Sequence, residues 1–94
     1  MERDFVERDI DAIIARVQEA LPGVRWQQLR VPQPIADDDG TWFMWIPGRE
    51  GEVQLESTTG QCPFLLESDR TMERVECGTV DEVVERVLVW LASD

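Results

Sequence analysis

The chain has 94 residues, of which 43% are hydrophobic and 31% charged, so a single globular domain spanning residues 1–94 is expected. The formal net charge of −11, with no basic stripe, disfavours binding to nucleic acids, because an acidic surface repels their phosphates. No apolar run approaches the roughly 20 residues of a membrane span, and the charged residues 1–9 lack the pattern of a secretory signal, so we expect a cytoplasmic protein without membrane association.

Both ends of the chain have the apolar periodicity of amphipathic helices. In residues 6–21, apolar side chains recur at spacings of three and four, and Pro22 and Gly23 then end the pattern. Residues 80–91 repeat this pattern, and Thr79 and Glu82 have the spacing of a capping box. The predicted inward positions are Val6, Ile10, Ile13, Ile14, Val17 and Leu21, followed by Val80, Val83, Val84, Val87, Leu88 and Leu91.

Short β-prone runs separated by turn residues lie between the two helices. Short links between consecutive strands favour antiparallel pairing with the nearest neighbour. The sequence therefore predicts an α+β domain in the order α-β-β-β-β-β-α, an antiparallel meander with the N- and C-terminal helices packed on one face. The five expected strands are residues 24–31, 41–46, 52–57, 62–67 and 72–77.

The pairing of these strands decides which side chains enter the core. If the last hairpin turns symmetrically about Asp69 and Arg70, the same reasoning can be extended strand by strand across the sheet. A slip of one residue would turn every side chain of a strand to the other face. The expected pairs are Cys62 with Cys77, Phe64 with Val75, Leu55 with Phe64, Phe43 with Leu55 and Trp45 with Val53, and Leu66 completes this core face.

The second strand is apolar on both sides, which predicts a contact surface. With Phe43 and Trp45 turned inward, its other apolar side chains point to the opposite face of the sheet. An apolar patch with a polar rim is typical of a protein interface, and a two-fold homodimer is its commonest form. The predicted interface residues are Trp42, Met44, Ile46 and Leu65, with Trp26 from the first strand. Burial of this patch beneath a helix or the loop of residues 32–40 is an equal alternative, and a small-molecule groove is a third.

Several kinds of catalysis lack their residues. The chain contains no His, Lys or Tyr, which excludes an imidazole base, a Schiff-base lysine and a phosphate-loop lysine. Cys62 and Cys77 have three possible roles, as a disulfide, as metal ligands or as nucleophiles. Two thiolates fall short of a structural zinc site and no His activates them, so buried free thiols are the favoured interpretation.

Two acidic or polar segments also invite functional interpretations. The acidic residues 37–39 before Gly40 resemble part of a calcium loop, but Ile46 stands where the bidentate Glu belongs, so a turn is expected. Residues 54–67 are expected to form two strands around a hydroxyl-rich turn, in which Pro63 indicates an edge or a bulge that would expose backbone to a partner strand. A plain hairpin is the alternative. Carboxylate pairs such as Glu52 with Glu56 have no evident pocket.

The sequence predicts a non-catalytic protein-interaction domain, with no catalytic residue, metal or cofactor, that self-associates through the apolar sheet face. In charge and size it is similar to acidic neutralisers of basic partners, such as immunity proteins and small secretion chaperones, which gives one alternative. A small-molecule-binding module and a carboxylate or thiol enzyme are the others. Either would require an enclosed pocket with converging groups.

Overall fold

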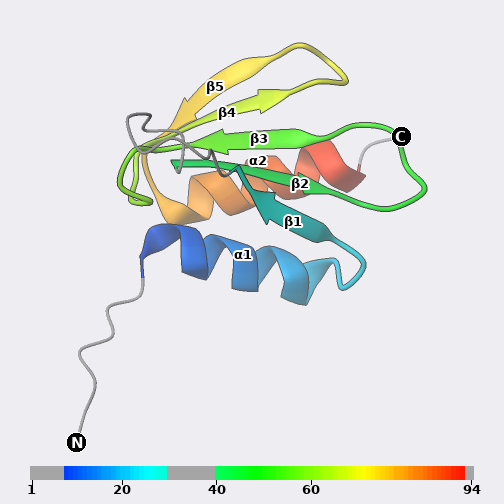
Figure 1. Cartoon of the computed structure of the whole chain (residues 1–94), viewed down its shortest axis with the longest axis horizontal. Helices are drawn as coiled ribbons and strands as arrows, with labels where there is room; N and C mark the ends of the chain where they lie inside the picture. Colours follow the sequence, from blue (N-terminus) through cyan, green and yellow to red (C-terminus); the bar gives the residue numbers. More distant parts are fainter. Residues whose placement is uncertain (1–7, 30–39, 93–94) are drawn as a thin grey trace, which may run out of the picture.

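The computed structural model describes residues 8–29 and 40–92, and it has the predicted α+β architecture (Figure 1). A five-stranded antiparallel sheet in the order β1-β2-β3-β4-β5 stands between two helices in the chain. Val6, Arg30, Val31 and the acidic run of residues 37–39 lie outside the described residues. The elements are α1 (Asp9–Ala20), β1 (Arg25–Gln28), β2 (Thr41–Trp45), β3 (Val53–Glu56), β4 (Phe64–Ser68), β5 (Arg74–Cys77) and α2 (Val80–Ala92).

Side chains cap the first turn of each helix. The backbone N–H of Arg8 donates to the Asp11 carboxylate at 3.0 Å, and this bond marks the start of α1. At the start of α2, the Thr79 hydroxyl accepts the N–H of Glu82 at 3.1 Å, as predicted. The Glu82 carboxylate accepts the N–H of Gly78 at 2.8 Å, so the returning half of this cap reaches one residue further back than expected.

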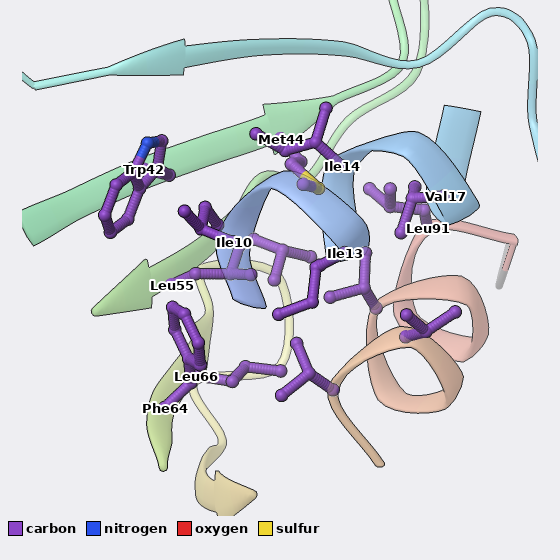
Figure 2. Packing of buried hydrophobic residues seen from close by; sticks show 14 of the residues in the cluster. Ile10, Ile13, Ile14, Val17, Trp42, Met44, Leu55, Phe64, Leu66 and Leu91 are labelled. Carbon is purple, nitrogen blue, oxygen red and sulfur yellow. The ribbon is translucent and has the colours of Figure 1, made fainter. Parts of the chain in front are cut away.

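The core lies between one face of the sheet and the two helices, which pack against each other on that face (Figures 1 and 2). The helical periodicity located this core correctly, since Ile10, Ile13, Val17, Val83 and Val87 are fully buried. The sheet contributes its largest buried side chains, Trp42, Phe64, Met44, Leu55, Leu66 and Val53.

The apolar pattern of the second helix missed Trp90, which is 92% buried (8% exposed). Its indole N–H donates to the Glu73 carboxylate at 3.2 Å, and the Arg86 guanidinium lies 5.6 Å from the ring centroid. Trp90 thereby joins α2 to the β4–β5 hairpin. A buried Trp with a hydrogen-bonded indole is typical of such a position.

Strand β2 is turned over relative to the prediction. Trp42 pairs with Leu55 and Met44 with Val53, so Trp42 and Met44 enter the core and are only 2% and 1% exposed. The predicted inward placement of Phe43 and Trp45, and the outward placement of Trp42 and Met44, were therefore wrong.

The connection between β2 and β3 accounts for this one-residue slip. The N–H of Arg49 donates to the carbonyl of Ile46 at 3.0 Å, which closes a four-residue turn with Pro47 and Gly48 at its centre. Gly48 has a φ of +89°, as the third position of a type II turn requires. The observed pairs of Trp42 with Leu55 and Met44 with Val53 are centred between Gly48 and Arg49, whereas the prediction centred the reversal on Arg49 itself. This shift of half a residue exchanges the two faces of β2.

The other two pairings are displaced by two residues, which preserves the faces. Leu55 pairs with Leu66, and Phe64 pairs with Cys77. Cys62 consequently precedes the ladder instead of facing Cys77. Pro63 also lies before β4, a central strand, so its predicted place at an edge or a bulge was wrong.

Candidate interaction surface

The sheet face turned away from the helices carries the candidate site, and no helix of the described chain covers it (Figure 1). Alternation along the strands and the observed pairing place side chains on this open face. Phe43, Trp45 and Leu65 are its apolar members, and each is partly buried. The open face is completed by Arg25, Gln27, Thr41, Glu52, Gln54, Glu56, Glu67, Arg74 and Glu76.

Only one of the five predicted interface residues lies on the open face. Leu65 does so, as expected. Trp42 and Met44 are in the core, and Ile46 packs against it. Trp26 pairs with Met44 and therefore lies on the helix-covered side, at the β1 edge, where 42% of it is exposed. Sequence reasoning missed Phe43 and Trp45, although the apolar character of both sides of β2 was the signal for them.

A hollow of about 240 Å³ opens on this face beside the turn between β4 and β5, next to the start of β3. Phe43 and Met72 contribute apolar surface to it, and Met72 is 81% exposed with a φ of +63°. The remaining lining residues are polar or charged, namely Glu52, Gln54, Glu67, Ser68, Asp69, Glu73 and Arg74.

Hydrogen bonds hold two of the acidic lining residues of the hollow, Glu52 and Asp69, next to each other. The N–H of Glu52 donates to the Asp69 carboxylate at 2.7 Å, and the N–H of Asp69 donates to the Glu52 carbonyl at 3.2 Å. Burial and the nearby Asp69 charge together raise the pKa of the Glu52 carboxyl. Arg74 bonds to Glu67 at 2.8 Å, so part of its charge is already matched. The open face therefore has a partly apolar centre and a surplus of negative charge.

The polar stretch between β3 and β4 has a structural role. The Asp9 carboxylate at the start of α1 accepts a hydrogen bond from the N–H of Cys62 at 2.8 Å. In turn, the side-chain carbonyl of Gln61 accepts a hydrogen bond from the N–H of Asp9 at 3.1 Å. The N–H of Ile10 donates to the Gly60 carbonyl at 2.9 Å. These bonds fasten the N-terminus of α1 to the β3–β4 connection, which accounts for its conspicuous composition without a ligand.

Cys62 and Cys77 are free thiols, with Cys77 buried and Cys62 partly buried. Burial, then the hydrogen bond and charge of Asp9, raise the pKa of the Cys62 thiol to about 11. Burial also raises the pKa of Cys77, and the Glu82 charge adds to it. Both thiols are thus protonated at neutral pH, whereas a nucleophile or a metal ligand must be a thiolate.

No protein-family model, curated protein or solved structure matches this chain. Within residues 8–29 and 40–92, no three Cys, Asp or Glu side chains converge as a metal site would require. Neither of the two helices in the described part of the chain is long and apolar enough to cross a membrane.

Proposed function

We propose that this chain is a non-catalytic protein-interaction domain that binds a basic partner protein through the open face of its sheet. The observation that carries the proposal is the register of β2, which presents Phe43 and Trp45 on a face rimmed by carboxylates. Aromatic side chains are enriched at the centres of protein interfaces, and acidic rims steer basic partners towards them.

The charge of the open face favours a basic partner over a second copy placed face to face. Such a dimer would oppose Glu52, Glu56, Glu67 and Glu76 to the same carboxylates of the other copy, and like charges across an interface are costly. Arg25 and Arg74 are the cations of this face in the described chain, and Arg74 is already paired with Glu67. A face-to-face homodimer is therefore the weaker proposal.

The size of this hollow does not favour a small-molecule site at this end of the face. Its volume of about 240 Å³ is below the roughly 300–1,000 Å³ of typical small-molecule sites. An arginine or lysine side chain of a partner fits the lining of this hollow. Its apolar stem can lie along the apolar lining residues, while its charged end pairs with the carboxylates.

A peptide titration followed by NMR tests this proposal. A synthetic peptide of alternating Arg and Leu should shift the resonances of Phe43, Trp45 and Leu65, and its affinity should fall as salt is added. Trp45→Ala should weaken binding at least about tenfold, as loss of a central aromatic does. The matched control is Trp26→Ala, which removes an exposed Trp outside the open face. Equal binding of a Glu-Leu peptide, or equal loss in both variants, would contradict the proposal.

A further inference from the structure

The outer edge of β5 is the second surface of the sheet that has the features of an interface. β5 is the last strand of the sheet, and no described segment pairs with its outer side (Figure 1). The N–H of Ser68 donates to the Glu73 carbonyl at 3.0 Å, which fixes the pattern of alternate hydrogen bonding between β4 and β5. By that alternation the backbone groups of Val75 and Cys77 point towards β4, and those of Arg74 and Glu76 point outward.

The side chains along this edge are self-complementary. Arg74 and Glu76 are both exposed and both lie on the open face, two residues apart. Consider two copies of β5 paired antiparallel about Val75. Each Arg74, which also bonds to Glu67 of its own copy, then stands opposite the Glu76 of the other copy. Both residues of each strand use their outward backbone groups.

The alternative registers are unfavourable. A shift by two residues in one direction places Arg74 opposite Arg74, and a shift in the other places Glu76 opposite Glu76; like charges directly opposite are destabilising. A one-residue shift mismatches the outward backbone groups altogether. One register therefore satisfies both the hydrogen bonds and the charges.

We infer that two copies of this chain associate edge to edge through β5, in this register, to form a continuous ten-stranded antiparallel sheet about a two-fold axis at Val75. Edge pairing also covers part of a mixed apolar and charged groove beside the strand. This groove of about 490 Å³ lies between β5 and α2. Its apolar lining is Val75, Cys77 and the 54% exposed Val89, and its charged lining is Glu76, Glu82, Glu85 and Arg86. A two-fold axis normal to the sheet leaves both open faces on the same side, so the dimer presents two of the proposed partner surfaces together.

Charge-reversed variants test this inference. Sedimentation equilibrium in about 150 mM NaCl, which screens the long-range repulsion between two acidic copies, should show a reversible monomer–dimer equilibrium for the wild type. Glu76→Arg and Arg74→Glu should each weaken self-association at least about tenfold, because each places like charges opposite one another. An equimolar mixture of the two variants should dimerise about as well as the wild type, because opposite charges then face each other in both pairs.

Three controls keep the experiment independent of net charge, of folding and of the proposed function. Glu19→Arg makes the same change in net charge as Glu76→Arg, but on an exposed position of α1, and should dimerise like the wild type. Circular dichroism should show folded secondary structure in all variants, and Trp45→Ala should leave dimerisation unchanged even if it abolishes peptide binding. A wild type that is monomeric at about 1 mM, where even small interfaces associate, would overturn the inference. So would single variants that dimerise normally, or folded variants that fail to associate when mixed.

Discussion

Gly40 packs closely against the β3–β4 connection, and Gly60 packs against the start of α1, so a side chain at either position would be crowded. A Cβ on Gly40 would lie 2.3 Å from the Ser57 carbonyl oxygen. The backbone N–H of Ser57 donates to the Gly40 carbonyl at 2.8 Å, which holds the two segments together. Gly60 has a φ of +77°, and a Cβ there would lie 3.2 Å from the Arg8 side chain. These residues are conspicuous in the sequence for reasons of packing, which a sequence alone does not separate from function.

Cys62 provides a pH-dependent prediction at the same scale. Because its pKa is raised to about 11, only about one thiol in a thousand is ionised at pH 8, and alkylation by iodoacetamide should be slow in the folded protein. The rate should rise about tenfold per pH unit until the pH approaches that pKa, as thiolate-dependent reactions do. Mass spectrometry of alkylated Cys62 measures it, with urea-unfolded protein as the control. Equal rates in both states at pH 8 would contradict the shifted pKa.

Among the elements, β2 decides both the core and the candidate site. The periodicity of the helices and the order of the strands were predictable, because apolar spacing and turn residues are local signals. The face of β2 was not predictable in the same way, since all of its side chains from Trp42 to Trp45 are apolar and either orientation buries two of them. The choice depends on the centre of the β2–β3 reversal, which lies between Gly48 and Arg49, because a shift of half a residue exchanges the faces.

Alanine variants of the two tryptophans of β2 test its orientation. Trp42→Ala should destabilise the protein by about 3–5 kcal/mol, because it empties a core site that the Phe64 ring and the Arg8 guanidinium also line. Trp45→Ala should cost only about 1 kcal/mol, since this side chain is partly exposed. Urea unfolding measures both losses. The reverse order would show that the strand is turned as the sequence first indicated.

The whole molecule carries a charge imbalance that its fold must tolerate. With 20 acidic side chains and 9 basic ones, repulsion between carboxylates opposes the compact state. Some of this charge is locally matched, as where Arg16 of α1 bonds to Asp81 of α2 across the helix pair. Exposed pairs of this kind contribute little free energy, so the net repulsion persists.

Salt should therefore stabilise the folded chain. Raising NaCl from about 10 mM to about 150 mM shortens the Debye length from roughly 30 Å to 8 Å and screens this repulsion. We expect the Tm to rise by a few degrees, which for a domain of this size corresponds to somewhat under about 1 kcal/mol. Thermal unfolding followed by circular dichroism measures the shift. A Tm that falls with NaCl would mean that favourable ion pairs outweigh the repulsion.

The sequence by itself determined the fold class, the order of the elements, the helical half of the core and the absence of residues that several kinds of catalysis need, because these follow from composition and local spacing. Only the tertiary structure decided which side of β2 faces solvent and which residues of the distinctive β3–β4 stretch bind α1. Those choices depend on the centre of one turn and on contacts between segments far apart in the chain. Neither the centre of a turn nor a contact between distant segments can be predicted from local periodicity.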